Sequence, residues 1–233
     1  MFTMEIPSIK VIAFDADDTL WVNETFFRKA EEDFCELVSA YLPKEEANKL
    51  LFEIEMQNLG LYGYGIKPFT LSLIEAAIKI TNGNMDIALV ETLIERGKKM
   101  LQEPVELIDG IEETLEYLSK KYRLVMATKG DLLDQERKLI KSGLEKYFHH
   151  IEIVSDKTEK QYQKLVDHLD IDKSEFLMVG NSLKSDILPV LNIGAYAFHI
   201  PFHTTWVHEV YNGTIDHPNF KSLTHSKELL HYL

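Results

Sequence analysis

Short apolar segments alternate with helical segments through the second half of the chain, and this alternation restricts the fold more than any other feature of the sequence. Strands are expected at 122–127, 150–154, 175–179 and 195–200. Helices are expected at 110–121, 132–142, 158–169 and 183–191. An apolar run at 9–14 adds a strand near the start of the chain. Because strands that alternate with helices form a parallel sheet covered on both faces, we predict an α/β, Rossmann-like core.

The stretch between the first two expected strands has a different character, because its patterns are helical and contain no convincing strand. Four helices are expected there, at about 23–41, 44–58, 69–81 and 85–102. In the first of them Phe27, Ala30 and Phe34 recur at helical spacing and would face a partner. We therefore expect an α/β core built from 1–21 and 105–233, with a helical-bundle cap, 22–104, inserted after the first core strand.

Charge and cysteine content narrow the function classes. The 233 residues carry 38 acidic and 25 basic side chains, a formal net charge of −13. Such an acidic surface repels phosphate backbones, which argues against nucleic acid as a partner. No apolar run approaches the ~18–20 residues of a membrane span. The single cysteine, Cys35, cannot form an internal disulfide, and with no recognisable signal peptide this favours the cytoplasm.

Three acidic residues, Asp15, Asp17 and Asp18, directly follow the first expected strand. In parallel sheets ligands bind outside the carboxyl ends of the strands, so Asp15 would lie at the binding edge and Asp17 could reach the same place. Carboxylates that close together repel one another unless a cation joins them. The pattern indicates a Mg²⁺ site with one carboxylate as a nucleophile, or alternatively a solvated acidic turn in which Asp18 has a capping role.

Residues 14–20 read Phe-Asp-Ala-Asp-Asp-Thr-Leu and resemble the first motif of the haloacid dehalogenase superfamily, an apolar run followed by Asp-x-Asp-x-Thr. The second motif of that superfamily is a strand that ends in Ser or Thr, and Thr128 matches it, with Lys129 directly after it. The third motif is a lysine near the start of a helix, matched by Lys157, with Lys160 as the alternative. All three motifs occur in the order that the family has.

The fourth motif of the family is an apolar strand followed by Gly-Asp and another Asp. Residues 176–186 match it, with Gly180 and Asp186 in the expected places and Asn181 where Asp is commoner. An amide oxygen can still bind a hard cation, directly or through water. The resemblance covers about 9–21 and 105–201, and the place of the insertion resembles the C1 cap subclass.

The resemblance implies a phosphatase that acts on a small phosphorylated metabolite with Mg²⁺ as its cofactor. Asp15 would attack phosphorus and form an aspartyl-phosphate. Asp17 would protonate the leaving oxygen and then activate the water that hydrolyses the intermediate. The Thr128 hydroxyl, the backbone N–H of Lys129 and the Lys157 ammonium would bind the phosphoryl group.

The same resemblance implies that Mg²⁺ is held by the side chains of Asp15 and Asp186 and by the backbone carbonyl of Asp17, with Asn181 as a further ligand. The cation and Lys157 would explain how an acidic protein binds an anionic substrate. The true dehalogenases of the superfamily lack an acid at the position of Asp17 and need no metal, so a phosphatase is favoured over a dehalogenase. Two alternatives stay open: a phosphomutase of the β-phosphoglucomutase type, and an interaction protein with weak catalysis, which Asn181 suggests.

Two further segments carry candidate functional residues. Tyr62 and Tyr64 lie in a glycine-rich stretch between two expected helices, where they either contribute to substrate specificity or pack a tight turn. The segments 21–25 and 98–106 are the expected two-stranded hinge of the cap. Four histidines gather late in the chain and suggest either loop histidines, which we favour, or a zinc site: His199, His203, His208 and His217.

Overall fold

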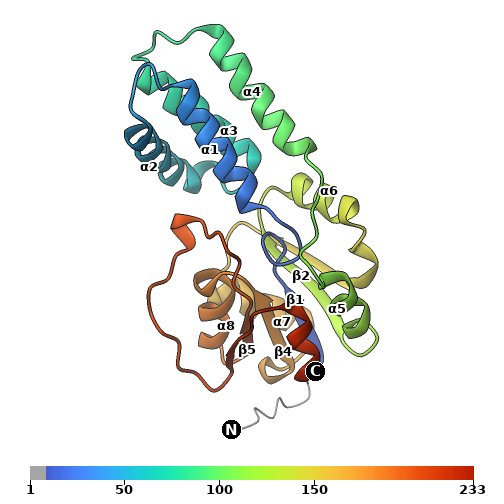
Figure 1. Cartoon of the computed structure of the whole chain (residues 1–233). Coiled ribbons are helices and arrows are strands. Elements are labelled where there is room, and N and C mark those ends of the chain that lie inside the picture. The colour runs from blue at the N-terminus through green and yellow to red at the C-terminus, as the bar shows by residue number, and fades with distance from the viewer. Residues whose placement is uncertain (1–8) are drawn as a thin grey trace. The chain divides into compact units, whose positions relative to one another are not determined.

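The computed structural model of the chain describes residues 9–233, which form two compact units. The first unit contains the segment up to Glu24, residues 105–129 and residues 138–233, and the second contains residues 25–104 and 130–137 (Figure 1). The sequence places 130–137 with the core, whereas in the structure this segment belongs to the helical unit. The reason is local, since Asp131 forms an ion pair of 2.8 Å with Lys67 of the helical unit. The functional division into core and cap remains a prediction.

The first unit is built on a sheet of six strands, all parallel, in the order β3-β2-β1-β4-β5-β6. The strands are β1 Val11–Phe14, β2 Arg123–Lys129, β3 His150–Val154, β4 Phe176–Gly180, β5 Tyr196–His199 and β6 Phe220–Ser222. The predicted parallel α/β sheet is therefore confirmed, although β6 has no apolar run and was not expected. Phe14 pairs with Met126 of β2 and Val179 of β4, so these three strands end at one edge.

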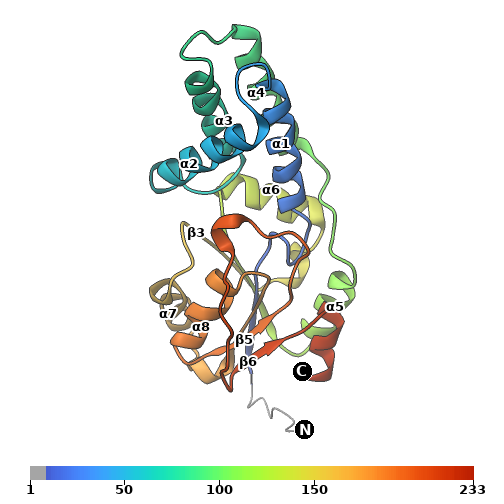
Figure 2. The ribbon, with the colours of Figure 1, turned by 60° about the vertical axis from the view of Figure 1, so that its left-hand side comes forward.

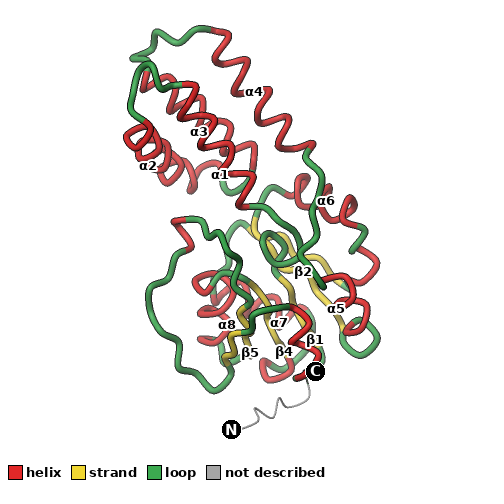
Figure 3. Tube along the Cα trace, in the orientation of Figure 1, coloured by secondary structure: helices red, strands yellow, loops and turns green. Residues whose placement is uncertain are grey.

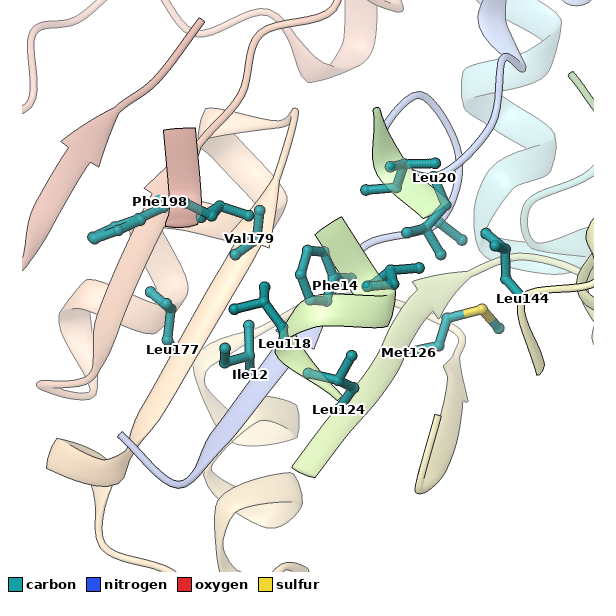
Figure 4. Packing of buried hydrophobic residues seen from close by; sticks show 14 of the residues in the cluster. Ile12, Phe14, Leu20, Leu118, Leu124, Met126, Leu144, Leu177, Val179 and Phe198 are labelled. Carbon is teal, nitrogen blue, oxygen red and sulfur yellow. The ribbon is translucent and has the colours of Figure 1, made fainter. Parts of the chain in front are cut away.

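Helices cover both faces of this sheet, as the sequence predicts. The α-helices of the core sequence are α5 Ile111–Leu118, α6 Leu132–Ser142, α7 Glu159–His168 and α8 Leu188–Asn192, and of α6 only the part from residue 138 belongs to this unit. Alternate side chains of β1 point to opposite faces, so Ile12 and Phe14 pack in one apolar cluster and Val11 and Ala13 in another. Figure 4 shows Ile12 and Phe14 within the first cluster, among Leu118, Leu124, Met126, Leu177 and Val179.

The expected helix at 183–191 is interrupted in the structure. Residues Leu183–Ile187 form a π-helix, and α8 continues from Leu188. Pro189 has no backbone N–H to donate to the carbonyl of Ser185, which instead accepts a hydrogen bond of 3.1 Å from the Tyr162 hydroxyl. The wider turn holds Asp186 in a buried position one residue after Ser185.

The second unit is a bundle of four helices, α1 Glu24–Leu37, α2 Lys44–Tyr62, α3 Ile66–Ile80 and α4 Ile87–Gln102 (Figures 2 and 3). The prediction of four helices in this stretch is confirmed, and α3 packs against both α2 and α4. Their apolar faces form one core that includes Phe34, Leu51, Leu73 and Leu93. Tyr62 is the last residue of α2 rather than part of a loop, because the turn begins at Gly63, whose φ of 74° ends the helix.

No helix in the described part of the chain combines the length and the apolar character that crossing a bilayer requires.

Two helical glycines of the bundle differ in what surrounds them and give a matched test of its packing. A Cβ at Gly97 would lie 2.2 Å from Thr70 Oγ1 and 2.9 Å from Thr70 Cγ2, whereas a Cβ at Gly60 would meet nothing within 4 Å. We expect Gly97→Ala to lower the free energy of unfolding by about 1–2 kcal/mol, because overpacking outweighs the gain in helix propensity. Gly60→Ala should raise it by about 0.5–1 kcal/mol. Urea unfolding of both variants measures this, and equal effects would contradict the packing.

The bundle also contains a half-buried acidic residue, Glu55, whose Oε1 is buried and has no hydrogen-bond partner among the described residues. Burial, together with the negative charge of Glu31, raises the pKa of Glu55 to about 8, although Arg28 acts in the opposite direction. The carboxyl group is therefore neutral in the folded protein at a pH where it is ionised in the unfolded chain. Its contribution to stability is present below about pH 4.5 and is lost as the pH rises through 8.

We expect Glu55→Gln to weaken the dependence of stability on pH between 5 and 8, because glutamine has no proton to lose. The free energy of unfolding, measured in urea at both pH values, should fall less in the variant than in the wild type. Glu53→Gln on the same helix is the matched control, since the Glu53 side chain is 52% exposed. A pH dependence in Glu55→Gln equal to that of the wild type would show that this carboxyl is not desolvated.

Candidate active site

Asp15 lies at the carboxyl edge of the sheet, directly after β1. Its backbone N–H donates to the Val179 carbonyl at 2.9 Å, which extends the pairing of β1 with β4 by one residue. The chain then turns sharply, and the amides of Thr19 and Leu20 both donate to the carbonyl of Ala16. Asp15 is only 8% exposed, so its carboxylate is fixed at the end of a central strand.

Asp18 has the capping role that the sequence suggests as an alternative to chemistry. Its carboxylate accepts hydrogen bonds from the backbone N–H groups of Asn23, at 2.8 Å, and Glu24, at 3.1 Å, where α1 begins. The residue has a positive φ of 62°, which closes the turn after Asp17.

A buried ammonium group joins two of the predicted carboxylates. Lys157, from the loop before α7, donates to Asp15 Oδ1 and, at 2.6 Å, to Asp186 Oδ1. Side-chain exposure is 3% for Lys157 and 1% for Asp186. Burial and the neighbouring Asp186 raise the pKa of Asp15 to about 7, against the lowering influence of Lys157. Burial by itself would lower the pKa of Lys157, but the two carboxylates outweigh it and raise that pKa.

Asp17 is held by two side chains that no sequence motif indicates. Its Oδ1 accepts from Trp21 Nε1 at 2.7 Å and from Lys138 Nζ at 2.9 Å. Lys138 also donates to Asn23 Oδ1 at 2.8 Å. Trp21 directly follows the first motif, and this position is the one signal that could have indicated it as a partner of Asp17. Lys138 carries no such signal, because it lies 121 positions from Asp17 in a helix that contains several other charged residues.

Asn181 lies beside the first motif, as its place after β4 predicts. In the amide orientation that satisfies both of its polar atoms, the nitrogen lies 3.1 Å from Asp15 Oδ2 and 3.3 Å from the Asp17 carbonyl oxygen. The Thr19 hydroxyl lies 3.3 Å from the same amide. Asn181 therefore contacts two of the groups that the resemblance assigns to the metal.

These groups suit a hard divalent cation. Across residues 9–233 no three His, Cys, Asp or Glu side chains converge as a metal cluster, so a site here depends on two carboxylates supplemented by other oxygens. Asp15 and Asp186 bind the same ammonium and therefore lie close together, and the Asp17 carbonyl and the Asn181 amide are adjacent to Asp15. Mg²⁺ keeps several waters and needs few protein ligands, all of them oxygens. The carboxylates of Asp15 and Asp186 and the carbonyl of Asp17 fit it, whereas Asn181 turns its N–H₂ group toward these oxygens.

The phosphate-binding candidates lie at the end of β2. Thr128 is 1% exposed and its hydroxyl donates to the carbonyl of Lys129 at 3.2 Å. The Lys129 ammonium donates to Ser185 Oγ at 2.9 Å and forms an ion pair of 2.5 Å with Glu209. The family resemblance assigns the backbone N–H of Lys129 to the phosphoryl group. No sequence motif indicates Glu209 as a partner of the Lys129 side chain, because it lies 80 positions away in a loop.

The remaining candidates are two tyrosines and four histidines, which lie outside the group formed by Asp15, Lys157 and Asp186. Tyr62 and Tyr64 belong to the helical unit, and their role stays a prediction. Three of the late histidines have partners one or two residues away, as loop histidines do: His203 contacts the Thr204 hydroxyl, His208 the Trp206 ring and His217 the Asn219 amide. His199 differs from them, because it is the last residue of β5 and its ring contacts the backbone carbonyl of Asn181.

Comparison with known proteins agrees with the motifs. A family model described as haloacid dehalogenase-like hydrolase matches residues 9–194. The N-acylneuraminate-9-phosphatase of Mus musculus is 27% identical over 217 residues, which cover 88% of this chain and 85% of that protein. The glyceraldehyde 3-phosphate phosphatase of Methanothermobacter thermautotrophicus is 27% identical over 205 residues, which cover 81% of this chain and 84% of that protein.

Solved structures give the same result. A haloacid dehalogenase-like family hydrolase from Xanthomonas campestris has a TM-score of 0.85 and 36% identity, and the match covers 94% of this chain and 88% of that one. A HAD-hydrolase from Bacillus subtilis, described as bound to magnesium, has a TM-score of 0.63 at 20% identity over 96% of this chain and 98% of that one, which shows a shared fold. With a family model that spans most of its length and the four motifs on the expected elements, the chain belongs to the haloacid dehalogenase-like hydrolase family.

Proposed function

We propose that this hydrolase is a Mg²⁺-dependent phosphatase that cleaves a small phosphomonoester through an aspartyl-phosphate on Asp15. The observation that carries the proposal is the buried cluster in which Lys157 joins Asp15 and Asp186 at the carboxyl edge of the sheet, with a second acid, Asp17, two residues further on. Such a cluster combines a nucleophile, an acid and positive charge, which phosphoryl transfer requires.

In the first step Asp15 Oδ attacks phosphorus and forms a P–O bond, while the ester P–O bond breaks in line with it. The electron pair of that bond goes to the leaving oxygen, which takes a proton from the Asp17 carboxyl group. Lys157 stabilises negative charge shared between the phosphoryl oxygens and Asp15, and the Thr128 hydroxyl and Lys129 backbone N–H orient the group. A Mg²⁺ ion held by Asp15, the Asp17 carbonyl and Asp186, with Asn181 beside them, would screen the approach of two anions.

In the second step a water molecule attacks the phosphorus of the aspartyl-phosphate. Asp17, now ionised, takes a proton from this water, and the bond between phosphorus and Asp15 Oδ breaks, which releases phosphate and restores both carboxyl groups. The contacts from Trp21 and Lys138 keep the Asp17 side chain in a defined position for both proton transfers. A halide leaving group needs no proton, so an anchored acid at position 17 favours a phosphatase over a dehalogenase.

The substrate class is supported by the names of the relatives. Both curated relatives cited above are phosphatases of small phosphorylated compounds derived from sugars, N-acylneuraminate 9-phosphate in one case and glyceraldehyde 3-phosphate in the other. We therefore propose a sugar-derived phosphomonoester as the substrate, and residues 22–104 as a cap that contributes to its selection, with Tyr62 and Tyr64 as candidate specificity residues. A panel of triose, pentose, hexose and sugar-acid phosphates, assayed for phosphate and for isomers, separates a phosphatase from a phosphomutase.

Asp15→Asn tests the nucleophile. We expect phosphate release in the presence of Mg²⁺ to fall by roughly 10³-fold or more, because an amide cannot form the acyl-phosphate. The matched control is Asp109→Asn, the same change at a carboxylate whose side chain is 94% exposed, which should keep wild-type turnover. Thermal unfolding verifies that both variants fold. Retention of more than a tenth of the activity by a folded Asp15→Asn variant would refute covalent catalysis at this residue.

Asp17→Asn tests the acid and base. Hydrolysis of an alkyl phosphate should fall by roughly 10²–10⁴-fold, because the alkoxide then leaves without a proton. With p-nitrophenyl phosphate, whose leaving group needs no proton, the variant should accumulate a covalent phosphoryl group, because the second step lacks its base. Intact-protein mass spectrometry detects this group, and the double variant Asp15→Asn/Asp17→Asn should lack it. Equal losses with both esters and no covalent adduct would assign Asp17 a different role.

A further inference from the structure

A long segment between β5 and β6 brings a carboxylate to the edge of the candidate site. The chain leaves β5 at His199 and returns to the sheet at Phe220, and Figures 1 and 2 show the intervening residues as an extended loop with one short helical turn. That turn is Val207–Glu209, and Glu209 is its last residue. The family motifs do not include this segment, and the steps proposed above do not use Glu209.

Glu209 binds three side chains from two different strand ends. Its Oε1 accepts from Lys129 Nζ at 2.5 Å, at the end of β2. Its Oε2 accepts from Ser185 Oγ at 2.6 Å and from Ser182 Oγ at 2.5 Å, both in the loop and π-helix after β4. Each oxygen of the carboxylate is therefore occupied by donors that belong to a different part of the candidate site.

The carboxylate of Glu209 is ionised and largely shielded from solvent. The side chains of Lys129 and Glu209 are 13% and 12% exposed. Burial by itself would raise the pKa of Glu209, but the charge of Lys129 and the three hydrogen bonds outweigh it and hold that pKa at about 2. Burying an ion pair seldom stabilises a fold more than apolar packing would, so the pair calls for a role other than stability.

The serines connect Glu209 to the predicted metal ligand. The Ser182 backbone N–H donates to Asp186 Oδ2 at 2.9 Å, and the Ser185 backbone N–H donates to Ser182 Oγ at 3.0 Å. Ser185 also precedes Asp186 directly in the chain. One carboxylate oxygen of Glu209 therefore fixes both ends of the short segment that orients Asp186.

We propose that Glu209 is a positioning residue of this site, which holds the loop bearing Asp186 through Ser182 and Ser185 and holds the end of β2 through Lys129. It acts on the cation without touching it, in the way that hydrogen-bonded partners behind metal ligands set affinity. The inference rests on the proposed function, since it assumes that Asp186 binds a divalent cation.

Glu209→Gln tests the role with little change in size. The amide keeps one acceptor for the serines but turns an N–H₂ group toward the Lys129 ammonium, so the cluster loses its charge balance. We expect the dissociation constant for Mg²⁺, measured by isothermal titration calorimetry with the phosphate-free protein, to rise by about 10–100-fold. With p-nitrophenyl phosphate, turnover should fall most at low Mg²⁺ and recover in part as Mg²⁺ is raised, because the loss acts through the affinity for the cation.

Two further variants make the test specific. Glu209→Asp retains the charge and should recover part of the Mg²⁺ affinity lost in Glu209→Gln. Glu228→Gln is the matched control, because Glu228 also accepts from a backbone N–H and a hydroxyl, both of Thr224, outside the site, and it should leave Mg²⁺ affinity unchanged. If Glu209→Gln does not fold, Ser185→Ala removes one donor to Glu209 and should still weaken Mg²⁺ binding several-fold.

The outcomes separate this inference from the proposed function. The positioning role is refuted if a folded Glu209→Gln variant binds Mg²⁺ with a dissociation constant within twofold of the wild type, whatever its turnover. If Glu209→Gln does not fold, the same result for Ser185→Ala refutes it. A wild-type protein that binds Mg²⁺ but hydrolyses no phosphate ester refutes the proposed function, and a weakened affinity in the variant would then still support the role of Glu209. A wild-type protein that binds no Mg²⁺ refutes both.

Discussion

The candidate site depends on one buried ammonium group, that of Lys157, placed between the carboxylates of Asp15 and Asp186. Two carboxylates this close and this buried would otherwise repel each other and resist ionisation. The ammonium compensates that repulsion and connects the end of β1, the loop before α7 and the π-helix after β4. A divalent cation would supply the same compensation for the oxygens, which is why the donor set suits both a lysine and Mg²⁺.

The parallel sheet makes this convergence possible. β1 lies in the middle of the sheet, with β2 and β4 as its neighbours, so residues at the ends of these three strands or directly after them meet at one edge. Thr128, Asp15 and Asn181 are close in space for this reason, although long stretches of chain separate them.

Specific interactions then set the finer arrangement of side chains. Trp21 and Lys138 hold Asp17, while Glu209 gathers Lys129, Ser182 and Ser185. These partners come from a turn, a helix and a long loop, none of which has a motif. They contribute charge balance around groups that the motifs supply.

The sequence determined the α/β class, the inserted helices and the identity of Asp15, Lys157 and Asp186 as the central group, because strand periodicity and motif order are local properties. It did not determine β6, the π-helix at Leu183–Ile187 or the contacts of Lys138 and Glu209. These depend on contacts between residues as much as 121 positions apart, which only the tertiary structure decides, since a single charged side chain carries no local signal of its partner.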